Sequence, residues 1–183
     1  IIIPNGSTCF IRWTDFDATG ADDGLGIDDF SLTAGFAAES SDYFRSITSG
    51  DWNSLATWES STDNAIWVAA TAIPNFAANT TTIRNTHTVI FNSFLTIDQV
   101  IIESGGILNF NNGILTVNDG VGNDIDIQSN GVFVLSLDNS PPVLGGGSPT
   151  INISSGATLK ASASGLTAAV PTNGVNVSNY VYE

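Results

Sequence analysis

Residues 81–182 consist of short runs of alternating apolar and polar residues, separated by corners that contain Gly or Asn. Because alternation buries one face of a strand, such a chain can form a core only by pairing many short strands. The runs GILNF and GILTV match position by position, with Ile107 like Ile114, Leu108 like Leu115, and Phe110 like Val117. The pattern predicts an all-β fold built from repeats.

Two architectures fit this pattern. In a parallel β-solenoid, each short strand buries one face against the coils above and below it. A meander of hairpins, as in a sandwich or jelly roll, is the alternative, because Asn-Gly is also a hairpin signal. The runs are often only four or five residues long and their phrases recur, which favours a right-handed parallel β-solenoid over residues 81–183. Ile102 and Leu108 would then point into the core, and residues 137–149 would form a loop that projects from one coil.

Residues 43–80 differ from the repeats, because three Trp residues lie close together among turn-forming residues. An irregular Trp-rich unit typically buries its rings over the exposed end of a regular structure. We therefore expect Trp52, Trp58 and Trp67 to form an N-terminal cap on the repeats. The alternative is an exposed aromatic platform, which would bind sugar rings.

Residues 1–35 contain two or three strand-like runs, among them Cys9–Phe16 and Ile27–Leu32, and residues 36–42 look like a linker. A few strands cannot close a core alone, so we expect either partner strands upstream of Ile1 or packing of this piece on the residues that follow. Cys9 is the only cysteine, which excludes an internal disulfide. We expect it to be a small buried hydrophobic residue.

The charge of the chain limits its partners. There are 18 acidic and 4 basic residues, for a net charge of -14. Neutralising phosphates takes several clustered cations, so binding to nucleic acid or to anionic lipid is not expected. No apolar run is long enough to cross a membrane, and an acidic, Lys-poor surface is typical of an extracellular protein.

Two stretches resemble modules of large extracellular proteins of Bacteroidetes. The stretch RWTDFDATGADDGLGIDDFSLT resembles the closing strands of a jelly-roll module, where an acidic pair precedes a final strand. The stretch that follows resembles a β-helix module. Its matching residues are Ser49, Gly50, Trp52, Thr57, Trp58, Pro74-Asn75, Ile83, Arg84, His87, Thr88, Val89, Asp98-Gln99-Val100, Ile102-Glu103 and Gly105-Gly106.

The resemblance implies a cargo of the type IX secretion system, exported through an outer-membrane translocon to the cell surface. It assigns residues 1–35 to the C-terminal strands of a jelly-roll-like sandwich that precedes the cap and the solenoid. We expect a fragment of a larger secreted protein, with a structural or adhesive rather than an enzymatic role. The alternatives are a carbohydrate-binding module for surface polysaccharide, or an accessory segment of a secreted nuclease or polysaccharide-degrading enzyme.

The acidic turn between residues 15 and 29 is the candidate metal site. Calcium binds several carboxylate and carbonyl oxygens supplied by flexible loops. A Gly-rich turn could fold Asp22 or Asp23 back toward Asp28 or Asp29, so a structural calcium ion is the candidate cofactor. The alternative is a solvated turn in which Asp is a turn former. The candidate ligands are Asp17, Asp22, Asp23, Asp28 and Asp29, with Asp15 nearby.

No other residues form a convincing active site. His87 is the only histidine and is flanked by Thr86 and Thr88, so we interpret it as a hydrogen-bonded structural residue. Asp124 and Asp126 alternate with isoleucines, which would place both carboxylates on the outer face of one strand, about 7 Å apart. That spacing suits glycoside hydrolysis. Carboxylates on an open face would titrate alike, however, so a solvated face is the expectation.

Overall fold

The computed structural model describes residues 8–12, 38–135, 143–144, 149–160 and 180–181. The chain divides into two compact units, residues 1–37 and residues 38–183. In the first unit, residues 8–12 have no regular secondary structure and Cys9 is exposed. The prediction that Cys9 is buried is therefore wrong, because the described residues 8–12 form no strand that could bury it. The other predicted strands of this unit, including Ile27–Leu32, lie outside the described residues.

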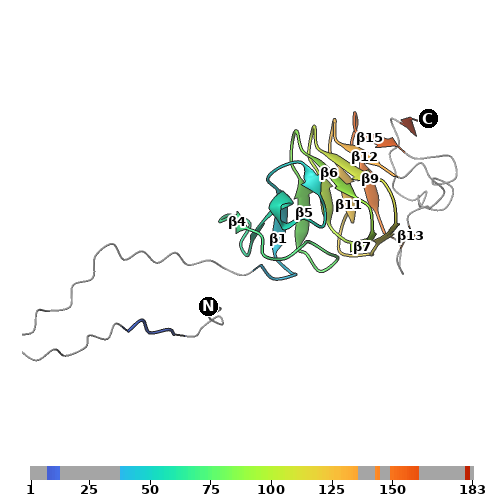
Figure 1. Cartoon of the computed structure of the whole chain (residues 1–183). Helices are drawn as coiled ribbons and strands as arrows, with labels where there is room; N and C mark the ends of the chain where they lie inside the picture. Colours follow the sequence, from blue (N-terminus) through green and yellow to red (C-terminus); the bar gives the residue numbers. More distant parts are fainter. Residues whose placement is uncertain (1–7, 13–37, 136–142, 145–148, 161–179, 182–183) are drawn as a thin grey trace, which may run out of the picture. The chain divides into compact units, whose positions relative to one another are not determined.

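The described residues of the second unit are all-β, with no α-helix and one short 3-10 helix, η1 (Leu55–Thr57). The strands form three sheets (Figure 1). The seven-stranded sheet has the order β14 (Ile151–Ile153), β11 (Ile125–Ile127), β8 (Val100–Ile102), β5 (Thr80–Ile83), β1 (Tyr43–Ser46), β3 (Trp58–Ser61), β4 (Val68–Ala69). The six-stranded sheet has the order β16 (Tyr180–Val181), β15 (Thr158–Lys160), β12 (Val132–Val134), β9 (Ile107–Phe110), β6 (Thr88–Phe91), β2 (Gly50–Asp51). The three-stranded sheet has the order β13 (Val143–Leu144), β10 (Ile114–Val117), β7 (Phe94–Ile97).

The chain visits the three sheets in a fixed order. Strands β5, β6 and β7 lie in the seven-, six- and three-stranded sheets respectively, and β8 to β10 and β11 to β13 repeat that order. We call each such set of three strands a circuit. Equivalent strands of successive circuits are parallel, so that β6, β9, β12 and β15 lie side by side in Figure 1. Among the described strands, the antiparallel pairs are those of β3 with β1 and with β4.

The register between circuits keeps the apolar face inside. Val100 pairs with Ile125, and Ile125 with Ile151, offsets of 25 and 26 residues. All three of these side chains are buried, as are the matched Leu108 and Phe133 of the six-stranded sheet. The predicted burial of Ile102 and Leu108 is confirmed, since both are 0% exposed.

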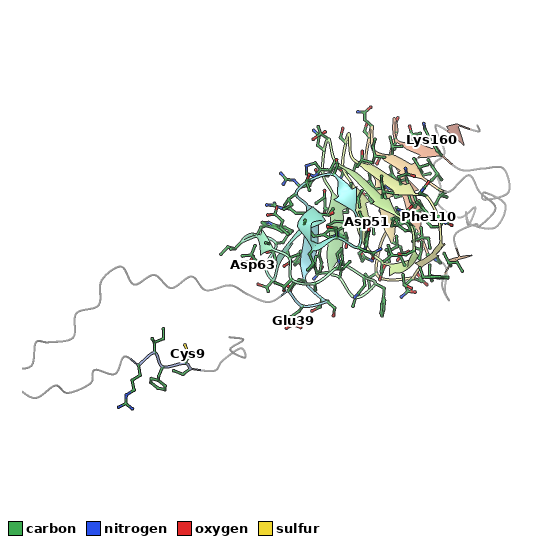
Figure 2. All side chains as sticks on the ribbon, in the orientation of Figure 1. Cys9, Glu39, Asp51, Asp63, Phe110 and Lys160 are labelled. Atoms are coloured by element: carbon green, nitrogen blue, oxygen red, sulfur yellow. The ribbon has the colours of Figure 1, made fainter. Side chains whose placement is uncertain are left out.

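Aromatic rings continue this core to the end of the stack of circuits. The rings of Phe91 and Phe110 are stacked with centroids 4.8 Å apart, and Trp52 meets Phe91 edge-on at 6.1 Å. Trp58 meets Trp52 edge-on at 4.9 Å. The fully buried Phe110, labelled in Figure 2, thus belongs to a row of four rings.

The connection between the seven- and six-stranded sheets is the most regular part of the fold. It has four residues in each of the three circuits, 84–87, 103–106 and 128–131, and again between β14 and β15, at 154–157. In each, the amide of the fourth residue donates to the carbonyl of the first, for example from Gly131 to Gln128 at 2.7 Å. The third residue has positive φ, which defines a type II turn. These third residues are Thr86, Gly105, Asn130 and Gly156, with φ of 66°, 79°, 62° and 82°.

The third residues also bond one another along the stack. The amide of Thr86 donates to the carbonyl of Gly105, that of Gly105 to Asn130, and that of Asn130 to Gly156. We call this row of turns the type II column. It joins the circuits at one corner through bonds that lie outside the three sheets.

The region predicted to be a projecting loop, residues 137–149, is not simply a loop. Val143 and Leu144 form β13, which pairs in parallel with Thr116 and Val117 of β10. This part of the prediction is wrong, because a strand of only two residues within a Pro- and Gly-rich stretch is too short to give an alternating pattern. The runs GILNF and GILTV also occupy different sheets, in β9 and β10, so their likeness does not mark neighbouring strands.

Candidate functional site

The first type II turn lies against a buried serine. The hydroxyl of Ser46, at the end of β1, is 2.9 Å from Nδ1 of His87 and accepts a hydrogen bond from the amide of Arg84. A hydroxyl group can take part in more than one hydrogen bond, so Ser46 can bond to the amide of Arg84 and to Nδ1 of His87 at the same time. The prediction that His87 is hydrogen-bonded is confirmed. Ser46 is 0% exposed, so this pair does not present a nucleophile to a substrate.

Serine hydroxyls replace backbone carbonyls at this end of the stack. In later circuits the amide of Glu103 donates to the carbonyl of Ile83, and the amide of Ile107 to that of His87. The corresponding amides of the first circuit, at Arg84 and Thr88, donate to Oγ of Ser46 and Ser49 at 2.9 Å. The sequence pattern did not predict this role of Ser46. The one signal near Ser46 in the sequence was Ser49-Gly50, which belongs to the β-helix resemblance.

The Trp-rich segment closes the same end. Trp52 and Trp58 are 0% exposed, and their indole nitrogens donate to the carbonyls of Pro74 and Trp52. The predicted burial is confirmed for these two rings, which excludes them as a sugar platform. Trp67 is half-buried, and the guanidinium of Arg45 lies 4.0 Å above its ring centre.

Arg45 also belongs to the main charge cluster of the described residues. Its Nε is 2.5 Å from Oε1 of Glu59, and a guanidinium nitrogen of Arg84 lies 3.7 Å from the same oxygen. Two of the four cations of the chain are therefore committed to one carboxylate. This cluster joins β1, β3 and the first type II turn.

Two carboxyl groups meet where the three-stranded sheet passes to the seven-stranded one. Asp98 follows β7 and Asp124 precedes β11, and both lie against Gly120. Asp124 is 0% exposed, and its two oxygens accept hydrogen bonds from the amides of Gly120 and Thr150. Burial, and then the neighbouring Asp124 carboxylate, raise the pKa of Asp98 above its ordinary value.

The predicted placement of Asp124 on an open face is therefore wrong. Ile125 and Ile127 do point inward, as expected. Asp124 precedes the strand, however, and its buried carboxylate accepts hydrogen bonds from two backbone amides there. Asp126 is half-buried, and its Oδ1 accepts a hydrogen bond from Nδ2 of Asn152 at 2.6 Å. The two carboxylates thus have different partners and do not form a shared catalytic site.

The hairpin from β3 to β4 holds a third carboxylate with a clear structural role. Asp63, labelled in Figure 2, accepts hydrogen bonds from the amides of Ile66 and Ala65 and from the hydroxyl of Ser61. These bonds lower its pKa, the amide of Ile66 having the largest effect. The carboxylate orders the turn that ends the seven-stranded sheet.

The candidate calcium ligands Asp17, Asp22, Asp23, Asp28 and Asp29, with Asp15, lie outside the described residues. Within the described ranges, no group of three or more His, Cys, Asp or Glu side chains is placed to hold a metal ion. No buried side-chain nitrogen or oxygen there lacks a hydrogen-bond partner. The same part of the chain has no helix with the length and hydropathy needed to span a membrane.

A comparison with protein-family models, with curated proteins and with solved structures found no match for this chain.

Proposed function

We propose that the second unit is a right-handed parallel β-solenoid that serves as a rigid structural segment of a larger secreted surface protein. The single observation that carries this proposal is the repeated circuit, with one strand in each sheet, parallel in-register pairing and a type II turn at one corner. Stacked repeats contact only their neighbours, so such a module gains length by adding circuits.

The chemistry of the polar clusters supports a structural role. The hydroxyl of Ser46 and both carboxylate oxygens of Asp124 accept hydrogen bonds from backbone amides, as does Oδ1 of Asp63, and Glu59 lies beside two arginines. A catalytic acid or base needs a free oxygen or nitrogen within reach of a substrate. The resemblance to Bacteroidetes modules adds the proposal of surface adhesion and of export by a type IX system.

The experiment is to remove one circuit in register. Deleting residues 100–124 joins Gln99 to Ile125, which takes over the place of Val100, its partner in the parallel register. A spacer should keep its fold and lose about 4.8 Å of length. The matched control deletes residues 100–124 and also Ser129, which shortens a turn of the type II column from four residues to three and shifts β12 by one residue against β6, so that its apolar face turns outward.

We expect the first deletion to keep a cooperative melt and β-sheet circular dichroism, and the second to lose both. In the parent protein, cell-surface attachment should survive loss of a circuit. If removing residues 100–124 unfolds the unit as thoroughly as the control, the solenoid interpretation is wrong. If the unit stays folded but attachment disappears, these residues hold a binding site and the spacer role is refuted.

Carbohydrate binding is the second candidate function. The observation that favours it concerns exposed apolar residues of the three-stranded sheet and not the buried Trp residues. Phe94 is 79% exposed and pairs with Ile114, which is 39% exposed, on the outer face of the three-stranded sheet. An exposed ring on a flat strand surface offers a place for a sugar to stack. Retention on immobilised polysaccharide that is lost in Phe94→Ala would establish this function, and equal retention would exclude it.

A further inference from the structure

The described residues hold two Asn-Gly pairs in different hydrogen-bonding environments. Asn112-Gly113 connects β9 to β10, and Asn130-Gly131 lies in the type II column. Both asparagine side chains are exposed. The glycine amides differ, because that of buried Gly131 donates to the carbonyl of Gln128 at 2.7 Å. The amide of Gly113 donates to no group among the described residues.

An asparagine followed by glycine can lose ammonia without any catalyst or cofactor. The backbone nitrogen of the glycine gives its proton to solvent and bonds to Cγ of the asparagine. The bond from Cγ to Nδ2 then breaks, and Nδ2 takes up a proton from solvent and leaves as ammonia. Water opens the resulting cyclic imide at either carbonyl, which gives aspartate or isoaspartate. The first step needs a glycine nitrogen that is free of other hydrogen bonds.

Nothing among the described residues around Asn112 holds its side chain away from this reaction. Its carboxamide bonds to no described residue, whereas the neighbouring Asn111 donates from Nδ2 to Oδ1 of Asn92 at 2.9 Å. Gly113 has a φ of 116°, and a Cβ added there would lie 2.1 Å from the carbonyl oxygen of Ser93. The backbone therefore requires glycine at position 113. Glycine is also the residue that, placed directly after an asparagine, hinders this reaction least, because it has no side chain.

We propose that Asn112 is a site of spontaneous deamidation in the folded protein, and that its type II turn protects Asn130. The reaction adds one negative charge at the corner between the six- and three-stranded sheets. In the isoaspartate product it also adds one methylene to the main chain there. The type II column lies at a different corner and stays unmodified.

The test compares both sites in one sample of the full chain. The protein is incubated near pH 8 in water enriched in oxygen-18, digested and mapped by mass spectrometry, in which deamidation gives a gain of about 1 Da before the isotope is counted. The amide of Gly131 must first leave its hydrogen bond inside a buried turn, so Asn112 should react roughly tenfold or more faster than Asn130. In denaturant the two rates should become similar.

Asn112→Gln is the matched variant, because a longer side chain forms the cyclic imide much more slowly. It should remove the fast-reacting peptide and leave the rate at Asn130 unchanged. Equal rates at the two sites in the folded chain, or faster reaction at Asn130, would overturn the proposal. So would a difference between the sites that persists in denaturant, since it would then come from local sequence and not from the fold.

Discussion

Thr86 is the residue of the type II column that fits its position least. The third residue of a type II turn has positive φ, which favours Gly or Asn. The later circuits have Gly105, Asn130 and Gly156 there, but the first has a β-branched threonine at φ of 66°. A left-handed conformation costs an ordinary L-residue about 1–2 kcal/mol, and a β-branched side chain is among the least tolerant.

We expect Thr86→Asn to stabilise the folded chain by about 1 kcal/mol, because asparagine tolerates this conformation. The exposed threonine hydroxyl makes no hydrogen bond to the described residues, so the substitution removes no side-chain contact. The amide bond from Thr86 to the carbonyl of Gly105 is kept. For a chain of this size, the gain should raise Tm by about 2–4 °C.

Urea denaturation followed by circular dichroism measures the change, and the reverse substitution provides the control. Asn130→Thr puts the β-branched residue into an equivalent turn and should destabilise the chain by about 1 kcal/mol. The two variants differ in sign only if backbone conformation is the cause. If Thr86→Asn leaves the midpoint unchanged or lowers it, strain at Thr86 does not limit stability and the reasoning fails.

Three further predictions concern the core, the carboxyl pair and the acidic turn. Ile102→Asp buries an unpaired charge and should cost about 3–5 kcal/mol in urea denaturation, whereas Ile101→Asp, on the half-exposed outer face, should cost less than about 1 kcal/mol. Because the folded chain raises the pKa of Asp98 above 3.8, this group stabilises the fold most below that value, and the contribution is lost as pH rises through the folded-state pKa. Asp98→Asn should therefore flatten the fall in Tm above pH 4, and an unchanged slope would show that other groups cause it. If the acidic turn binds calcium, a chelator should lower the Tm of the unmodified chain but not that of a variant in which Asp28 and Asp29 are both changed to Asn. An unchanged Tm in the unmodified chain would show that the turn is a solvated loop.

Alternation predicted the inward faces of the strands well, because burial in a strand follows a period of two residues. Ile102, Leu108 and Ile125 all point into the core, as the pattern indicates. The burial of Trp52 and Trp58 could also be predicted, since large rings among turn-forming residues need a core to pack on. These predictions use only the periodicity and size of side chains.

The polar contacts were less accessible to sequence reasoning. Asp124 was expected on an open face, but its burial depends on two amides, one of them from Thr150 in the next circuit. The capping by Ser46 likewise depends on which amides lack a carbonyl partner at the end of the stack. Such contacts join residues far apart in the sequence, and the local pattern does not encode them.

Chain length is not shared equally among the three corners of a circuit. The four-residue turn recurs unchanged, but the segment between the three- and seven-stranded sheets grows from two residues, after Ile97, to seven, after Val117. The strands on either side still pair in register. This corner therefore accepts insertions that the type II column would reject. Foreign peptide sequences could therefore be inserted between Val117 and Ile125, away from the residues that contact Asp98. They would be displayed at a defined position along the row of circuits, because the type II column sets the spacing between circuits.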